Sequence, residues 1–370
     1  MDCQDAAPFR AIAIPRNTAL SPDFVSDSAQ TESIQAQIQR KSTMKAIVQT
    51  EYGSADVLRL ENVDRPVVSD NGVLVRVHAA AVHAGDWHLM RGTPFIIRLM
   101  FGGLLKPKIR IPGTDIAGRV EAVGQNITAF GPGDEVFGDL SESGFGAFAE
   151  YVCTPEKALA LKPTNLTFEQ AATVPVSALA ALQGLRDAGQ LQSGQTVLIN
   201  GASGGVGSFA VQIAKAWGAI VTGVCSPSKA EMVRSLGADH VLDYAQATVP
   251  QNRQQYDLIF DAAAYRSVFD YRPVLAPKGT YVLVGGSTAR LFQVLLFGPL
   301  ISKIVGRKVV CLTSKPNPDD LRVLKTLIEA GKIVPYVDQC YSLSEVPLAI
   351  RRLEQRQVQG KIAISLRDGS

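Results

Sequence analysis

The sequence predicts an α/β protein with two domains, one rich in β-strands and one built on a parallel sheet whose strands alternate with helices. Short apolar strands separated by Gly and Pro fill the chain from Met44 to about Pro163. After Thr167, strands and helices alternate, which is typical of right-handed βαβ units. The length of 370 residues also favours two cores over one.

Composition narrows the class of protein. Apolar residues make up 46% of the chain and charged residues 19%, so a sizeable core can be buried. The net charge is +3 and the Lys and Arg residues are dispersed, so nucleic acid is not an expected partner. The five cysteines form no C-x-x-C pair, which favours a reducing compartment, and we expect a cytoplasmic protein.

Residues 1–43 differ from the rest, because they are rich in Ser, Gln, Asp and Ala and lack the apolar core of a secretory signal. We expect a disordered or processed extension. Arg10 and Arg16 leave import into an organelle open, although acidic residues such as Asp23 argue against a transit peptide. A membrane-spanning helix is not expected, because the longest apolar stretch, 291–306, is shorter than about 20 residues.

The β-rich domain is expected to begin at Met44. Period-two alternation over 72–78 predicts a half-buried strand, and the apolar run at 45–49 predicts another. Further short strands are expected at 116–123 and 133–137, where Gly and Pro punctuate the chain.

The second domain begins with an Ala- and Leu-rich stretch, 168–189, which predicts a helix with Thr167 as its N-cap. Apolar runs bounded by turn residues then alternate with helical patterns. The expected strands are 195–199, 219–224, 240–242, 256–260 and 279–284, and the expected helices are 207–217 and 229–236. The last segment of the chain adds an expected helix at 319–330 and a strand at 361–365.

A glycine-rich turn joins the strand at 195–199 to the next helix, in the sequence Val197-Leu-Ile-Asn-Gly-Ala-Ser-Gly-Gly-Val-Gly207. The glycines allow a sharp turn and a close approach to a pyrophosphate, which the helix N-terminus attracts. The strand before, the helix after and a further strand about 20 residues on make this a Rossmann dinucleotide-binding fingerprint. The residues expected to contact the cofactor here are Ser203, Gly204, Gly205, Val206 and Gly207.

The end of the next strand indicates which dinucleotide binds. NAD-binding proteins commonly place Asp or Glu there to hold the ribose 2′-hydroxyl. This chain has Val224-Cys-Ser-Pro-Ser-Lys229 instead, with no carboxylate to repel a 2′-phosphate. Ser226, Ser228 and Lys229 can bind that phosphate through two hydroxyls and a positive charge. We therefore expect NADPH as the cofactor.

Six further motifs accompany the glycine-rich turn. They are Met44-Lys-Ala-Ile-Val48, Asp86-Trp-His-Leu-Met-Arg-Gly92, Pro112-Gly-Thr-Asp-Ile-Ala-Gly118, Gly133-Asp-Glu-Val-Phe-Gly138, Gly146-Ala-Phe-Ala-Glu-Tyr151 and Ala171-Ala-Thr-Val-Pro175. Together they resemble the medium-chain dehydrogenase/reductase superfamily, and within it the zinc-independent quinone oxidoreductase (zeta-crystallin-like) branch. The resemblance covers about residues 44–366.

The resemblance implies a GroES-like catalytic domain formed by residues 44–170 and 311–370. A Rossmann domain that binds NADPH, residues 171–310, is inserted between the two parts, and the active site lies in the cleft. The resemblance also places Tyr244 near the 2′-phosphate, Gly285 near the nicotinamide and Lys361 near the cofactor. Because the family is commonly dimeric, it implies a homodimer.

Zinc is not expected. By motif alignment, the catalytic zinc ligands of this superfamily's alcohol dehydrogenases fall on His83, Thr114, Asp115 and Val176. Thr114 stands where the key His would be, and Val176 cannot bind a metal, so the usual three-ligand open site is incomplete. The four-cysteine lobe of the structural zinc is also missing from this chain.

Without a Lewis acid, the reaction must depend on positioning and hydrogen bonding. We expect hydride transfer from NADPH to a quinone or an α,β-unsaturated carbonyl. His88 is the leading candidate for proton donor or carbonyl polariser, and His83 for orienting the nicotinamide or substrate. Asp86 is expected to fix the loop. Alcohol–ketone chemistry, or nucleotide binding with little turnover, stay open as alternatives.

Two apolar stretches, 95–105 and 291–305, are unusual for exposed loops. By the resemblance, both flank the cleft, and we expect them to wall a wide apolar pocket for a lipophilic quinone or enone. Burial in a subunit interface and peripheral contact with a membrane are the alternatives.

Overall fold

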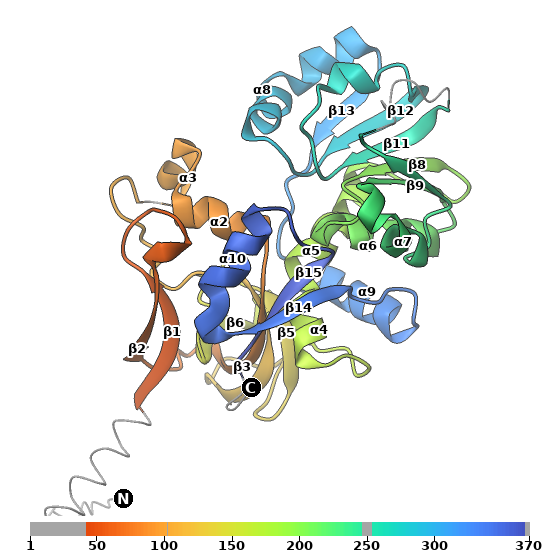
Figure 1. The fold of residues 1–370 in the computed structure, drawn as a ribbon. Coiled ribbons are helices and arrows are strands. Elements are labelled where there is room, and N and C mark those ends of the chain that lie inside the picture. The colour runs from red at the N-terminus through yellow and green to blue at the C-terminus, as the bar shows by residue number, and fades with distance from the viewer. Residues whose placement is uncertain (1–41, 102, 246–253, 367–370) are drawn as a thin grey trace, which may run out of the picture. The chain divides into compact units, whose positions relative to one another are not determined.

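The computed structural model describes residues 42–101, 103–245 and 254–366. The extension expected at residues 1–43 therefore lies almost wholly outside the described residues. From Met44 onward the chain forms one compact unit. Its strands lie in three sheets (Figure 1), the smallest of which pairs β1 (Thr43–Gln49) with β2 (Leu58–Asp64).

The largest sheet has seven strands and is mostly antiparallel. They are β3 (Gly72–Val82), β4 (Asp115–Val123), β5 (Glu135–Asp139), β6 (Tyr151–Pro155), β7 (Leu159–Leu161), β14 (Val337–Ser342) and β15 (Lys361–Ser365). Their spatial order is β14-β15-β3-β4-β5-β7, with β6 paired to β3. The chain therefore leaves this sheet after β7 and returns to it at β14. Helices α2 (Ala84–Arg91) and α3 (Phe95–Met100) lie in the connection from β3 to β4.

The segment between these two visits forms a six-stranded parallel sheet. Its strands are β8 (Thr196–Asn200), β9 (Ile220–Cys225), β10 (His240–Asp243), β11 (Tyr256–Asp261), β12 (Leu275–Leu283) and β13 (Lys308–Cys311). The order β10-β9-β8-β11-β12-β13 is the Rossmann order 3-2-1-4-5-6. Its crossovers contain α6 (Gly205–Ala216), α7 (Ala230–Ser235) and α8 (Thr288–Val305), so the predicted fold class is confirmed.

The helix predicted over 168–189 is interrupted. Thr167 caps α4 (Phe168–Ala172) as expected, with its hydroxyl accepting from the Gln170 N–H at 3.2 Å. A new helix, α5, starts at Pro175 and runs to Gln183, followed by one π-helical turn over 184–188. Proline has no N–H to continue α4 but suits the first position of a helix, so the break occurs in front of it.

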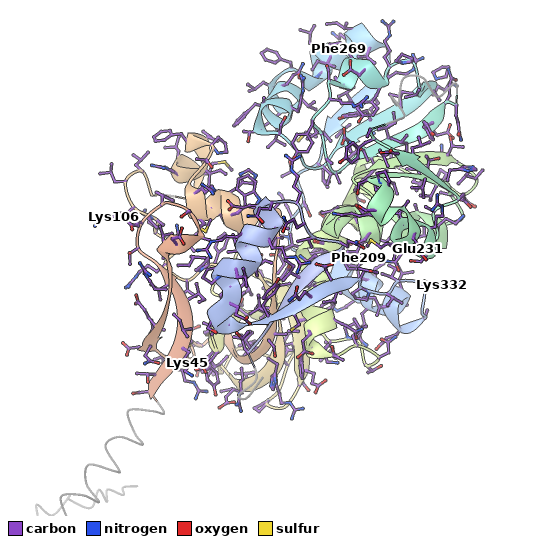
Figure 2. All side chains as sticks on the ribbon, viewed as in Figure 1. Lys45, Lys106, Phe209, Glu231, Phe269 and Lys332 are labelled. Atoms are coloured by element: carbon purple, nitrogen blue, oxygen red, sulfur yellow. The ribbon has the colours of Figure 1, made fainter. Side chains whose placement is uncertain are left out.

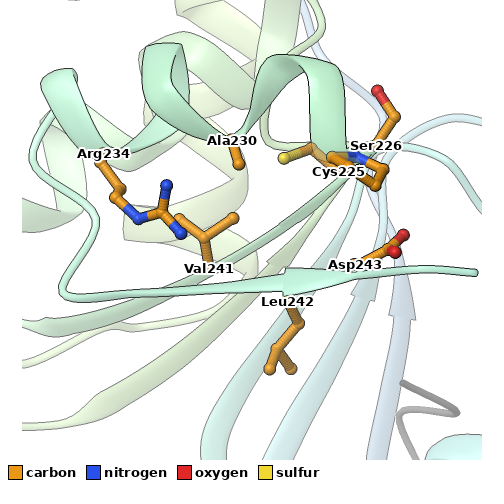
Figure 3. A pocket seen from close by; sticks show the side chains of 8 residues that line it. Cys225, Ser226, Ala230, Arg234, Val241, Leu242 and Asp243 are labelled. Atoms are coloured by element: carbon orange, nitrogen blue, oxygen red, sulfur yellow. The ribbon is translucent and has the colours of Figure 1, made fainter. Parts of the chain in front are cut away.

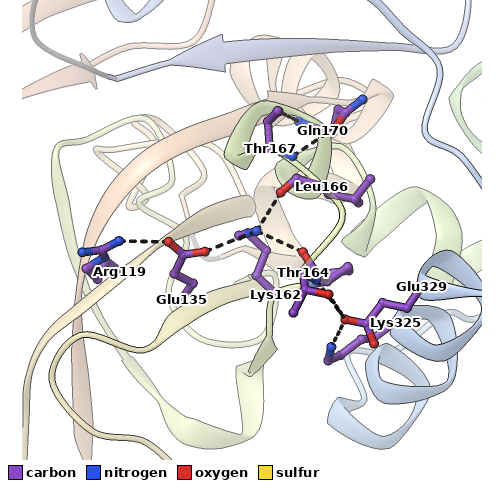
Figure 4. A network of polar contacts seen from close by, with 10 residues as sticks. Arg119, Glu135, Lys162, Thr164, Leu166, Thr167, Gln170, Lys325 and Glu329 are labelled. Carbon is purple, nitrogen blue, oxygen red and sulfur yellow. Dashed lines mark hydrogen bonds and ion pairs between the residues drawn. The ribbon is translucent and has the colours of Figure 1, made fainter.

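The two ends of the inserted segment are tied to the large sheet. The buried Lys162 ammonium, just after β7, donates to the Leu166 carbonyl at 2.7 Å and pairs with Glu135 of β5 at 3.3 Å (Figure 4). Glu329, in α9 (Pro318–Glu329), accepts from the N–H and the hydroxyl of Thr164, both at 2.9 Å. Apolar side chains fill the inserted sheet's core, where Phe209 of α6 is almost completely buried (Figure 2).

Candidate cofactor and active site

The glycine-rich turn lies at the carboxyl end of β8 and leads directly into α6. Gly201 adopts a positive φ of 79°, and a Cβ on Gly207 would lie 2.1 Å from the Gly201 carbonyl oxygen. Only glycine therefore lets α6 approach the turn this closely. A Cβ on Gly204 would meet a single atom, at 3.4 Å, so this side of the turn is open. The first N–H groups of α6 lack intrahelical acceptors, and the turn fits a pyrophosphate.

Lys361 reaches this turn from β15. Its Cδ lies 2.9 Å from where a Cβ of Gly205 would be, and the neighbouring Gly360 N–H donates to the Ser203 carbonyl at 2.8 Å. The Lys361 ammonium pairs with Asp115 of β4 at 3.0 Å, and both side chains are buried. Asp115 also accepts from the Val176 N–H at 2.7 Å. The pair therefore connects the large sheet, the turn and the start of α5.

A cavity of about 300 Å³ lies beside the carboxyl ends of β9 and β10 (Figure 3). Ser226 lines it, and its hydroxyl lies 3.3 Å from that of Ser228. Tyr244 follows β10, is more than half exposed, and bonds through its N–H to the Cys225 carbonyl. The structure therefore groups Ser226, Ser228 and Tyr244 at one end of the sheet.

Lys229, unlike Ser226 and Ser228, hydrogen-bonds to a distant segment of the chain. Its ammonium donates to the carbonyls of Val358 at 2.6 Å and Arg356 at 3.3 Å, and burial lowers the pKa of its side chain. It therefore lies between the nucleotide-binding sheet and the segment before β15. Its assignment to the 2′-phosphate stays a prediction.

Two charged residues of this cavity were missed by the sequence reasoning. Asp243 lines it because β10 pairs with β9 in a register that sets Asp243 beside Cys225. Residues 224–229 contain no carboxylate, but Asp243 of the neighbouring strand brings one to the cavity. Arg234 also lines the cavity, from α7, one helical turn beyond Ala230. That i, i+4 spacing was the available signal, but only a placed helix shows which way it faces.

Buried polar groups hold the strands together where the order of the parallel sheet reverses. The Asn200 amide of β8 donates to Asp261 of β11 at 2.7 Å, and the Tyr281 hydroxyl donates to the same carboxylate at 2.7 Å. Burial raises the pKa of Asp261. Gly285 lies beside them, with its N–H 3.3 Å from the Asp261 carbonyl. Ligands of doubly wound sheets bind at this kind of reversal, and the assignment of Gly285 to the nicotinamide stays a prediction.

His83 caps α2. Its Nδ1 accepts from the Gly85 N–H at 2.9 Å, so the neutral ring carries its proton on Nε2. Nε2 lies 2.7 Å from the Thr114 hydroxyl oxygen and donates a hydrogen bond to it. The Thr114 hydroxyl can therefore donate its own proton to a further partner. Asp86 accepts from the His83 N–H at 2.8 Å, so it fixes the loop through a capping box.

His88, in the last turn of α2, has a different arrangement. Its Nδ1 lies 2.9 Å from the Thr93 carbonyl, which can only accept, so Nδ1 carries the proton of the neutral ring. Its ring stacks on Trp87 with centroids 3.6 Å apart. Burial lowers the pKa of His88. Within the described residues Nε2 has no hydrogen-bond partner, so that nitrogen is free to receive or deliver a proton.

Carboxylates gather behind His83. Burial raises the pKa of Asp86, and burial together with the nearby Asp115 raises the pKa of Asp139 to about 6. Asp115 itself forms an ion pair with Lys361 at 3.0 Å. Over residues 42–101, 103–245 and 254–366, no three His, Cys, Asp or Glu side chains are grouped so that they could hold a metal ion.

Replacing Asp139 with asparagine is expected to stabilise the fold above pH 6. Its pKa rises from the usual 3.8 of an aspartate to about 6 in the folded chain, so the folded state binds more protons than the unfolded state between these two pH values. Stability therefore falls as pH rises from about 3.8 to about 6. At neutral pH the ionised Asp139 carboxylate lowers the free energy of unfolding by on the order of 2 to 3 kcal/mol. Asparagine can still accept the Ser141 N–H bond that Asp139 accepts at 2.9 Å.

Urea unfolding at pH 4.5 and 7.5 measures this effect. The difference in stability between the two pH values should shrink in Asp139→Asn and stay unchanged in Asp64→Asn, which removes an exposed carboxylate. Equal pH dependence in Asp139→Asn and the unmodified chain would show that Asp139 titrates normally.

Known proteins match most of the chain. The alcohol dehydrogenase GroES-like domain model matches residues 69–164, and the zinc-binding dehydrogenase model matches residues 236–364. A 2-methylene-furan-3-one reductase of Solanum lycopersicum is 34% identical over 334 residues, which cover 87% of this chain and 79% of that protein. An NADPH-dependent alkenal/one oxidoreductase, chloroplastic, of Arabidopsis thaliana is 34% identical over 362 residues, covering 93% and 87%. The solved structure of the quinone oxidoreductase from Coxiella burnetii has a TM-score of 0.78 at 28% identity, covering 88% of this chain and 100% of that one.

Proposed function

Because the chain belongs to the medium-chain dehydrogenase/reductase superfamily, we propose that it transfers hydride from NADPH to a quinone or an α,β-unsaturated carbonyl without zinc. The observation that carries this function is the glycine-rich turn at the carboxyl end of β8, packed against the buried Lys361. The relatives whose names specify alkenal, enone or quinone reduction support the acceptor class.

Each part of the site has a task in this proposal. The first N–H groups of α6 bind the pyrophosphate, and Ser226, Ser228 and Tyr244 receive the 2′-phosphate. Arg234 supplies positive charge there, which offsets Asp243 in the same cavity. NADPH, when bound, supplies the hydride. His83 is a positioning residue. Its Nε2–H donates to the Thr114 hydroxyl oxygen, so the Thr114 hydroxyl is oriented to donate its own proton to the substrate or the nicotinamide.

His88 is the proposed proton donor to the reduced acceptor. Only its imidazolium form can donate from Nε2, because the neutral ring keeps its proton on Nδ1 against Thr93. Since the pKa of His88 is lowered, kcat should rise as pH falls below about 6.5. Replacing His88 with asparagine should lower kcat on the order of 100-fold at pH 6 and flatten this profile, while KM for NADPH stays unchanged.

A stopped or continuous assay of NADPH oxidation over pH 5–8 measures this. His240→Asn is the matched control, because it changes an exposed histidine at the start of β10. If kcat of His88→Asn still rises as pH falls, a group other than His88 donates the proton.

Freedom from zinc is a proposal that the donor set supports. His83 is engaged by Gly85 and Thr114, and Asp115 by Lys361 and Val176, so both candidate ligands already have protein partners. Zinc sites of this kind need three protein ligands.

The reaction is tested by following NADPH oxidation with a benzoquinone, a short enone, a long-chain enone and a simple ketone, each with and without a chelator. We expect chelator-resistant reduction of the quinone or enone, with NADH far weaker and the longer enone preferred. Turnover of the ketone alone, abolished by chelator, would support alcohol–ketone chemistry with a metal. NADPH binding without turnover would favour a nucleotide-binding protein.

The state and location of the enzyme are further proposals. β13 is an edge strand of the parallel sheet, and a second copy could extend the sheet there to form the expected homodimer, which light scattering tests. A cytoplasmic location, or import through residues 1–43, is tested by comparing fluorescent fusions with and without that segment. Membrane contact stays a proposal too, and it concerns α8 rather than the cofactor site.

A further inference from the structure

Helix α8 has two very different sides. Its buried residues, Val294, Gly298, Ile301 and Val305, recur at the spacing of one helical face and pack in the core beside β13. The rest of the helix is also apolar. Its exposed large apolar side chains are Leu291, Leu295, Leu296, Phe297, Leu300 and Ile304, of which Leu296 is 67% exposed. A surface helix normally turns polar residues to water, so this exposed face needs an apolar partner.

Charge indicates which partner. From Tyr271 to Pro318 the chain has seven Lys and Arg residues and no Asp or Glu. Three of these cations, Lys303, Arg307 and Lys308, follow one another at the carboxyl end of α8 and the start of β13. Lys303 and Lys308 are exposed. A surface that combines exposed apolar side chains with clustered positive charge is complementary to anionic lipid headgroups over acyl chains.

We propose that α8 docks the enzyme on the surface of an anionic lipid bilayer. The helix lies on the membrane and does not cross it. By length and composition alone α8 could span a bilayer, and it is the one such helix in the described part of the chain, with 22% of its apolar window buried. Its 18 residues reach only about 27 Å, however, against a hydrocarbon core of about 30 Å. Its inner face is also packed in the sheet's core.

The occupant is a bilayer surface rather than a protein groove. The exposed apolar side chains occur on all sides of the helix that the sheet does not cover. Fluid acyl chains can surround such a surface, whereas a protein groove would need a complementary shape. The exposed cations lie at one end of the helix, where headgroup phosphates can meet them while the leucines enter the acyl region. This docking is independent of the reaction proposed above.

Flotation of the full chain with vesicles tests the proposal. Vesicles of phosphatidylcholine alone are compared with vesicles containing about one third phosphatidylglycerol, at 0.15 M salt. The unmodified chain should float with the anionic vesicles and stay behind with the neutral ones. Leu296→Glu/Leu300→Glu should lower the bound fraction at least tenfold, and Lys303→Glu/Lys308→Glu should do the same. Val67→Glu/Leu348→Glu, the matched control on exposed apolar residues elsewhere, should bind normally.

NADPH oxidation with a short, soluble enone is measured for every variant. Unchanged turnover together with lost flotation supports docking, and lost turnover with retained flotation concerns the reaction alone. Equal flotation of the α8 variants and the unmodified chain overturns the proposal, as does a chain that binds neither vesicle. Dissociation of a dimer by Leu296→Glu/Leu300→Glu, seen by light scattering without any vesicle binding, would assign α8 to an interface between two copies.

Discussion

Replacing Gly207 with alanine is expected to lower NADPH affinity on the order of 100-fold, a loss of roughly 3 kcal/mol in binding free energy. A methyl group there would lie 2.1 Å from the Gly201 carbonyl oxygen and 2.8 Å from the Ala202 Cα. These neighbours are backbone atoms and cannot rotate away. The start of α6 must therefore move from the turn, and its N–H groups no longer point at the pyrophosphate.

The effect is measured by titrating NADPH against intrinsic fluorescence, with thermal unfolding recorded in parallel. Gly298→Ala is the matched control, because its Cβ would have no neighbour closer than 3.7 Å and it lies inside α8. That change should leave NADPH affinity alone and stabilise the helix by up to about 1 kcal/mol. Unaltered NADPH binding by Gly207→Ala would mean that the cofactor does not use this turn.

Replacing Lys361 with methionine is expected to reduce the free energy of unfolding by about 3 to 5 kcal/mol. Methionine is one atom shorter than lysine and keeps an unbranched apolar side chain, but it leaves the Asp115 carboxylate buried without its ammonium partner, at a position with no exposure. Removing both charges in Asp115→Asn/Lys361→Met should recover much of this loss, because the unpaired charge causes it. NADPH affinity should fall in both variants, since Lys361 borders Gly205.

Urea unfolding of Lys361→Met, of Asp115→Asn and of the double variant gives the coupling free energy between the two residues. Lys332→Met, which removes an exposed lysine, should change stability by less than about 0.5 kcal/mol. A loss below 1 kcal/mol in Lys361→Met would show that water reaches Asp115 and that the pair does not seal this part of the site.

Local patterns were enough to predict the parallel sheet and the turn. The run of buried residues into Gly201 and the helix after it form a contiguous stretch, so sequence alone contains the whole motif. The break at Pro175 was missed when one helix was predicted over 168–189, although its signal, the missing N–H of proline, is a local property. What sequence reasoning missed depends on contacts between distant segments. Asp243 enters the cavity through strand register, and Lys229 meets carbonyls 127 and 129 residues away.

The histidines show a second limit. Motif alignment placed His83 and His88 near the substrate, but their protonation depends on individual hydrogen bonds. His83 holds its proton toward Thr114 because Gly85 occupies the other nitrogen, whereas the Thr93 carbonyl holds the His88 proton on the opposite nitrogen. Two residues of one type in one short segment therefore have different chemistry, and only the folded geometry distinguishes them.

The late return of the chain to its first sheet affects how the protein is made. β3 needs β15 along one side, yet about 200 residues separate β7 from β15. At 5–20 residues per second, a ribosome takes on the order of 10 to 40 s to supply them. During that interval the newly made strand has an open edge, which is prone to aggregation. The parallel sheet, whose strands are contiguous in the chain, can fold first, so the nascent first sheet is the part that needs chaperone protection until synthesis reaches β15.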